Sequence, residues 1–168
     1  MRWNDPIGYL ITITGYGTWL HGDERGSMDR KHGFVAPDFK LEEHRRSHLN
    51  HDPMKFDANM RKVIREAIEA DCLYRQRHIE AINVRTNHVH VVVLTSEDPS
   101  LVVKNIKAWA TRQLRKEGLV AADRPVWTEG GSKRWLWNRD DVRAACMYVM
   151  DCQGDDLPEV PVDSEPRT

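Results

Sequence analysis

The sequence lacks the features of an exported, disulfide-linked or membrane-spanning protein. Its three cysteines, Cys72, Cys146 and Cys152, form no CxxC pair, and an odd number without a disulfide framework fits a reducing compartment. No apolar run approaches the ~20 residues that a membrane-spanning helix needs. The first ten residues, MRWNDPIGYL, contain no apolar signal core. We therefore expect a cytoplasmic protein with no membrane partner.

A strong excess of positive charge is also missing. The 168 residues carry a net charge of −1, which does not by itself indicate nucleic-acid binding. The charge is uneven, because residues 154–168 hold five acidic side chains and one basic side chain. Residues 1–153 are left with 24 basic and 21 acidic side chains, a net charge of +3. The acidic, Pro-containing tail shows no apolar periodicity, so we expect it to be disordered.

Periodicity predicts one α+β domain over residues 1–153. Helix-starting signals stand at Asp57, at Asp98 followed by Pro99, and at Asn138, with the helices ending near Gln76, Gly118 and Gly154. Residues 15–56 are too long for a plain connection and are interpreted as a functional loop or an insertion. The expected strands are 8–14, 78–84 (an alternating run), 88–95, and a short aromatic strand within 126–138.

The order of these elements is βαββαβ followed by a further helix. This is the split ferredoxin-like (RRM-like) arrangement, in which one antiparallel sheet carries helices on one face. The strands 78–84 and 88–95 are expected to pair as a hairpin.

Two histidines in the stretch TNHVHVVV, residues 86–93, dominate the search for a functional site. Side chains alternate along a strand, so His88 and His90 point to one face and the valines to the other. Their Cα atoms lie ~6.6 Å apart, two strand rises, so both imidazoles can converge on one metal ion. The alternative is that they are polar residues on a half-exposed strand. A solvated strand face more often carries Thr, Lys or Glu.

Three segments together resemble a known family. NHVHVVV is similar to the HUH motif (histidine, hydrophobic residue, histidine) of single-tyrosine transposases, including the REP-associated tyrosine transposase branch. VWTEGGSKRWLWNRDDVRAACMYVMDCQG resembles the segment leading into their catalytic tyrosine helix, and GYGTWLHGDERGSMDR also looks like members of this group. The resemblance covers most of residues 7–154. It implies an enzyme that cuts single-stranded DNA and leaves a 5′-phosphotyrosine and a 3′-hydroxyl.

The resemblance places the nucleophile at Tyr148, on the last expected helix. A tyrosine at the edge of an amphipathic helix is otherwise an ordinary core-edge residue. The related transposases take a third metal ligand, often Gln or Asn, commonly four residues after the tyrosine. That position is Cys152 here, and Gln153 follows it. We favour Gln153, because an amide oxygen suits Mg²⁺ or Mn²⁺ better than a thiol does.

Other polar and aromatic residues allow more than one interpretation. His44 and His48 have the spacing of a zinc pair, but their segment is interpreted as a charged surface. Trp135 and Trp137 alternate, and we expect them in the core rather than stacked on bases. His21 lies in a Gly-rich loop expected to order on binding. The candidate DNA contacts are Lys133, Arg134, Arg139, Arg143 and His21.

The sequence therefore predicts a metal-dependent DNA endonuclease and strand transferase acting on single-stranded DNA with hairpin ends. Two alternatives stay open. One is a non-catalytic nucleic-acid-binding module, since RNA-recognition domains share the βαββαβ order. The other is a degenerate transposase that binds hairpins without cutting them. Homodimers are common in the family, although its more distant branch includes monomers.

Overall fold

The computed structural model describes residues 5–20, 27–29, 33–154 and 157. Its centre is a four-stranded sheet in the order β4-β5-β1-β6, with every neighbouring pair antiparallel. The strands are β1 (Gly8–Thr14), β4 (His78–Val84), β5 (His88–Leu94) and β6 (Ser132–Leu136). The prediction of four strands and of a 78–84/88–95 hairpin is confirmed.

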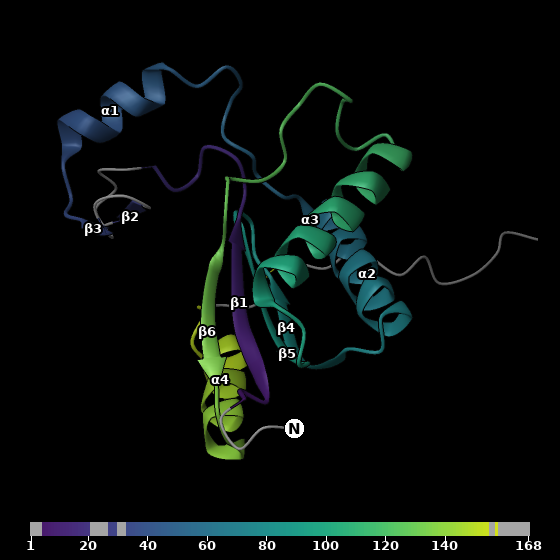
Figure 1. The fold of residues 1–168 in the computed structure, drawn as a ribbon. Coiled ribbons are helices and arrows are strands. Elements are labelled where there is room, and N and C mark those ends of the chain that lie inside the picture. Colours follow the sequence, from purple (N-terminus) through teal and green to yellow (C-terminus); the bar gives the residue numbers. More distant parts are fainter. Residues whose placement is uncertain (1–4, 21–26, 30–32, 155–156, 158–168) are drawn as a thin grey trace, which may run out of the picture.

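Helices lie on both faces of this sheet (Figure 1). Two helices, α2 (Ala58–Tyr74) and α3 (Pro99–Lys116), cover one face, and α4 (Arg139–Asp151) covers the other. The odd-numbered valines of β5 join the larger core under α2 and α3. A smaller core under α4 contains Leu10, Ala81, Val92, Leu136, Val142, Ala145 and Val149. The α+β, ferredoxin-like prediction with a separate C-terminal helix is confirmed.

Side-chain caps explain where the three long helices begin. The side chain of Asp57 accepts a hydrogen bond from the backbone N–H of Met60, and Asp98 accepts from the N–H groups of Ser100 and Leu101. Asn138 accepts from the N–H of Asp141 at 2.9 Å. Each bond satisfies a backbone donor that has no partner inside the helix. The three predicted helix starts are therefore correct.

The alternation expected for strand β4 is interrupted. The pairing with β5 shifts between Ile79 and Ala81, so Glu80 is an extra residue in the ladder. Such a bulge reverses which face the following residues occupy. As a result Ile82 joins the larger core, while Ala81 packs under α4. The bulge thereby brings Ile79, Ile82 and Val84 of HIEAINV into the same core, although Ile79 is in a different alternation class from the other two.

The segment 15–56 carries its own short elements: β2 (Ser27–Asp29), β3 (Gly33–Val35) and α1 (Phe39–Ser47). Helix α1 has no buried residue, and Figure 1 shows it standing away from the sheet. The imidazoles of His44, on α1, and of His48, its C-cap, lie close together with ring centroids 4.3 Å apart. The segment returns to the sheet at its end, where Met54 N–H donates to the carbonyl of Tyr16 at 2.7 Å.

The expectation that Trp135 and Trp137 are core residues is wrong. Their exposed fractions are 44% and 54%. Strand β6 lies at the edge of the sheet and ends at Leu136, so Trp137 is outside the strand. The Trp135 ring packs edge-on against buried Tyr9, with centroids 6.0 Å apart. An edge strand has one side without a covering neighbour, which leaves the rest of that ring in contact with solvent.

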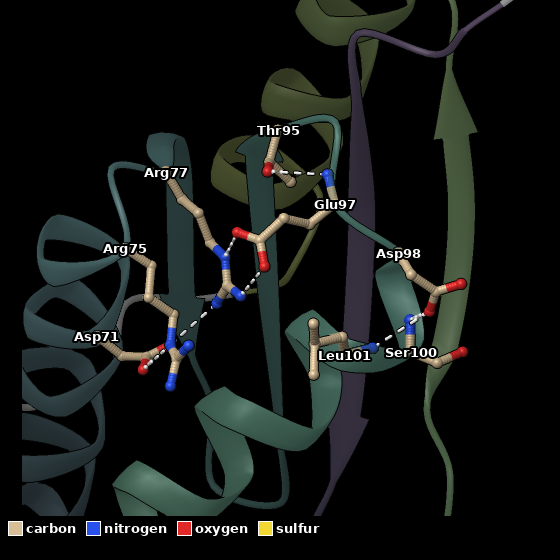
Figure 2. Close-up of polar contacts among 8 residues, drawn as sticks. All are labelled: Asp71, Arg75, Arg77, Thr95, Glu97, Asp98, Ser100 and Leu101. Carbon is tan, nitrogen blue, oxygen red and sulfur yellow. Dashed lines mark hydrogen bonds and ion pairs between the residues drawn. The ribbon is translucent and has the colours of Figure 1, made fainter.

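A largely buried ion-pair network joins α2 to the residue before β4 and to the connection between β5 and α3 (Figure 2). The Arg77 guanidinium binds both carboxylate oxygens of Glu97 at 2.7 Å and donates to Asp71 at 3.0 Å. The side chains of Arg77 and Asp71 are only 1% and 4% exposed. Arg77 lowers the pKa of Glu97 below its ordinary value. Arg75 adds a further bond to Asp71 from a more exposed position.

None of the helices in the part of the chain that the structure describes is long and apolar enough to cross a membrane.

We predict that Arg77→Met lowers the free energy of unfolding by roughly 3 kcal/mol, because it leaves the buried Asp71 carboxylate and the partly buried Glu97 carboxylate without a buried partner. Arg75→Met is the matched control, and its half-exposed pair with Asp71 should contribute about 1 kcal/mol or less. Urea denaturation followed by tryptophan fluorescence measures both. Equal losses in the two variants would contradict this description of the network.

Candidate active site

The two histidines of β5 lie side by side under helix α4. Their ring centroids are 4.7 Å apart. His90 is buried, at 5% exposure, whereas His88 is partly exposed at the end of the strand. The odd-numbered valines Val89, Val91 and Val93 face the opposite core, so His88 and His90 lie on the α4 side. The two imidazoles lie on one face of the strand, as its two-residue period predicts.

Gln153 brings a third donor to the two rings. Its Oε1 lies 3.0 Å from Nε2 of His90 and 3.4 Å from Nε2 of His88. Its Nε2 donates to the backbone carbonyl of Tyr148 at 3.0 Å. A carbonyl can only accept, so this bond fixes the orientation of the amide and turns Oε1 toward the histidines.

The choice between Gln153 and Cys152 follows from where the helix ends. Helix α4 ends at Asp151, and Cys152 is its exposed C-cap. Gln153 is therefore past the regular helix and is not bound to its ~100° step per residue. The chain turns there, and Gln153, rather than Cys152, meets both Nε2 atoms.

The far nitrogen of each ring is held by a neighbouring side chain. His88 Nδ1 lies 2.6 Å from Oδ1 of Asn87, and His90 Nδ1 lies 2.7 Å from Oγ1 of Thr12. An amide oxygen only accepts, so the His88 proton is assigned to Nδ1 and Nε2 is left as the electron-pair donor. The Thr12 hydroxyl allows the same tautomer at His90. Such partners on the far nitrogen are typical of metal-ligating histidines.

Burial keeps His90 in its neutral form. Desolvation, with a smaller contribution from neighbouring His88, lowers the pKa of His90 to about 4, and the bond to Gln153 opposes this shift. The ring is therefore uncharged at neutral pH, which is the form that binds a metal ion.

These donors fit a divalent cation bound by nitrogen and oxygen. Two imidazole Nε2 atoms and one amide Oε1 point at a common position. With both rings protonated at Nδ1, three electron-pair donors would face one another there, an arrangement that a cation stabilises. The described residues contain no cluster of three or more His, Cys, Asp or Glu side chains that could hold a metal. A cation here would complete its coordination with oxygen atoms of water or of a bound phosphate.

Tyr148 presents its ring beside this cluster. The ring is 46% exposed, and its centroid lies 5.5 Å from that of His90. Buried Val149 holds the adjacent position of α4 against the sheet. The phenol therefore sits at the solvent-facing edge of the histidine cluster, where a substrate can reach it.

The candidate DNA contacts are dispersed over the surface. Lys133 donates to Ser100 Oγ at the start of α3, and Arg134 is exposed on edge strand β6. Arg139 pairs with Glu80 at 3.4 Å and Arg143 pairs with Asp140 at the same distance. These two stand in the first half of α4, and Arg139 lies nine residues before Tyr148. His21 lies outside the described residues.

Three side chains that support the cluster were not singled out from the sequence: Thr12, Asn83 and Asn87. Thr12 and Asn83 are the cross-strand neighbours of His90 in β1 and β4. The Thr residues of β1 alternate with isoleucines, which indicates that the threonines share one face of the strand. Only the strand order shows that the histidines lie on that same face of the sheet. Asn87 directly precedes His88, and its contact could have been inferred from adjacency.

The chain is similar to proteins of one family. The family model Y1_Tnp, described as IS200-like transposase, matches residues 45–139. No curated protein matches the chain in sequence. A solved structure, of a REP-associated tyrosine transposase bound to a REP hairpin, is similar at 15% identity and a TM-score of 0.49. That similarity covers 89% of this chain and 67% of the other.

We predict that Gln153→Ala weakens Mn²⁺ binding by about tenfold or more, because it removes one of three convergent donors. Cys152→Ser is the matched control and should change the affinity by less than about twofold, because Cys152 caps the helix with its backbone. Isothermal titration calorimetry in the absence of DNA measures both affinities. A larger loss for Cys152→Ser than for Gln153→Ala would assign the ligand to the thiol.

Proposed function

The chain belongs to the IS200-like transposase family, and on this premise we propose that it is a metal-dependent endonuclease and strand transferase for single-stranded DNA. The proposed nucleophile is Tyr148, and the proposed metal ligands are His88, His90 and Gln153. We extend the substrate to DNA with hairpin-forming ends, as the family resemblance implies. The expected cofactor is Mg²⁺ or Mn²⁺.

One observation carries the proposal: Gln153 Oε1 lies within 3.4 Å of both imidazole Nε2 atoms, and the Tyr148 ring lies against His90. A tyrosine at the edge of a helix is ordinary, and so is a polar residue on a strand. A phenol beside three convergent metal donors combines a nucleophile with a site for a charge-stabilising cation, which is a combination suited to phosphodiester cleavage. The three elements that supply these groups are β5, α4 and the residue that follows its cap.

In the proposed reaction the Tyr148 oxygen attacks the scissile phosphorus. The new bond joins the tyrosine oxygen to phosphorus, and the bond from phosphorus to the 3′ oxygen breaks. The phenol loses its proton, and the departing 3′ oxygen gains one as it becomes a hydroxyl. The DNA 5′ end is then held as a phosphotyrosine. Because this ester retains the energy of the phosphodiester, attack by a 3′-hydroxyl can rejoin strands without ATP.

The protein's own side chains prepare the site for this step. A divalent cation, when bound, would polarise the phosphate and stabilise the negative charge that develops on its oxygens. Neutral His90, with Thr12 on its far nitrogen, is oriented to offer Nε2 as a ligand. Gln153 holds both the ligand set and the backbone of Tyr148 through the two ends of one amide. The nucleophile and the metal donors are thus kept in register with each other.

We predict that the protein forms a covalent adduct with labelled single-stranded hairpin DNA in the presence of Mn²⁺ or Mg²⁺. Tyr148→Phe should abolish the adduct, because the attacking oxygen is removed. His88→Ala should reduce it by at least about a hundredfold, because charge stabilisation at the phosphate is lost. A denaturing gel run in SDS, with and without EDTA, measures the adduct.

Tyr74→Phe is the matched control, since Tyr74 is 85% exposed on α2 and belongs to the opposite face of the sheet. It should form as much adduct as the unchanged protein. Tight binding of a cognate hairpin with no adduct at any metal concentration would reject the enzyme and favour a transposase-like binding module.

A further inference from the structure

Asn83 lies beside His90 on the side away from Thr12. The register of the sheet pairs Thr12 with His90 across β1–β5, and Asn83 with His90 across β4–β5. The three side chains form a row under helix α4. Thr12 contacts the imidazole ring, whereas Asn83 contacts the helix above it. The two neighbours of His90 therefore hold different parts of the site.

The amide of Asn83 donates to the backbone carbonyl of Val149 at 2.9 Å. This carbonyl belongs to the last turn of α4, where the carbonyls have no helical N–H left to accept from. The preceding carbonyl, that of Tyr148, accepts from Cys152 N–H and from Gln153 Nε2. The end of the tyrosine helix is thus held by two side-chain amides, one from β4 and one from Gln153.

Apolar packing alone would leave α4 freer to shift along the sheet. The face of α4 that meets the sheet consists of small and branched residues, Val142, Ala145 and Val149. Contacts between such residues are not directional, so they resist separation from the sheet better than a shift along it. The hydrogen bond from Asn83 to the Val149 carbonyl is directional and therefore opposes such a shift. Displacements near 1 Å at a reacting group can cost about a hundredfold in rate.

The bulge at Glu80 is what turns Asn83 toward α4. Ile79 packs against the larger core, and regular alternation would place Asn83 on that same side. The extra residue reverses the facing, so Ala81 and Asn83 lie under α4. A bulge that aims one polar side chain at the backbone beside Tyr148 is a feature of the kind found next to active sites.

We infer that Asn83 is a positioning residue that fixes the tyrosine helix along its axis, so that the Tyr148 oxygen meets the phosphate held at the histidine cluster. This role rests on the proposed function of Tyr148 as the nucleophile. Asn83 acts on the nucleophile through the Val149 carbonyl and is not itself a metal ligand. It should therefore affect the attack step and leave metal binding nearly unchanged.

The test uses Asn83→Leu, which keeps the size of the side chain and removes its donor, and Asn83→Ala as a second variant. Single-turnover formation of the SDS-resistant adduct is measured at saturating DNA and Mn²⁺. Calorimetry gives the Mn²⁺ affinity without DNA, and hydrogen exchange reports on the backbone of residues 148–153. We expect adduct formation to slow by about ten- to a hundredfold. The Mn²⁺ affinity should stay within about threefold, and exchange near the end of α4 should be faster.

Glu80→Gln is the matched control. Glu80 also joins β4 to α4, through Arg139 in the first turn of the helix, far from Tyr148. Its loss should leave the adduct rate within about twofold of the unchanged protein, because an exposed pair at the other end of the helix does not fix the tyrosine.

Several results would overturn the inference. An unchanged adduct rate in both Asn83 variants would do so, as would a fall in rate matched by an equal fall in Mn²⁺ affinity, which would place Asn83 in the metal site. Loss of the folded state in both variants would show a role in folding alone. If the unchanged protein forms no adduct, the proposed function fails. Faster hydrogen exchange in the Asn83 variants would then show only that Asn83 anchors the helix, with no role in a reaction.

Discussion

The alternation of strand β5 between two buried faces is the constraint on which the rest of the structure depends. Its odd-numbered valines pack under α2 and α3. Because side chains alternate along a strand, His88 and His90 must then lie on the α4 side. Because β5 is an inner strand with β4 and β1 as neighbours, the histidines are flanked by side chains on both sides. The burial that stabilises the fold therefore also aims and desolvates the groups that bind the metal in the proposed function.

The last turn of α4 connects this strand to the nucleophile. A helix that ended in solvent would satisfy its final carbonyls with water. Here the carbonyls of Tyr148 and Val149 accept from the amides of Gln153 and Asn83. The Gln153 amide has its other end on the two imidazoles. Side chains of the candidate site thus serve as partners for the final carbonyls of the helix, so the end of the helix and the donor cluster form one unit.

Much of the fold follows from local patterns. Asp57, Asp98 and Asn138 could be read as helix caps because capping depends on residues within one turn. The exposure of the tryptophans and the bulge in strand β4 could not be predicted from local patterns. Trp135 is exposed because β6 is an edge strand. The bulge in β4 places Ile79 in the same core as Ile82 and Val84, which regular alternation would not do. Both outcomes depend on how the strands are arranged and on which helices cover them, and local spacing does not give that arrangement.

In the candidate site, too, local patterns predicted some features and tertiary contacts decided the others. The sequence by itself determined the shared face of His88 and His90, since that needs only the two-residue period of a strand, and family resemblance pointed to Tyr148. The sequence left Gln153 and Cys152 as alternative metal ligands, because helical geometry does not set the direction of a side chain beyond the end of a helix. Only the tertiary structure brought Gln153 to both imidazoles and placed Thr12 and Asn83 beside His90. The hydrogen bonds of Gln153 with His90, of Asn83 with Val149 and of Thr12 with His90 join residues from 63 to 78 positions apart. Cross-strand register and helix packing, rather than local spacing, decide them.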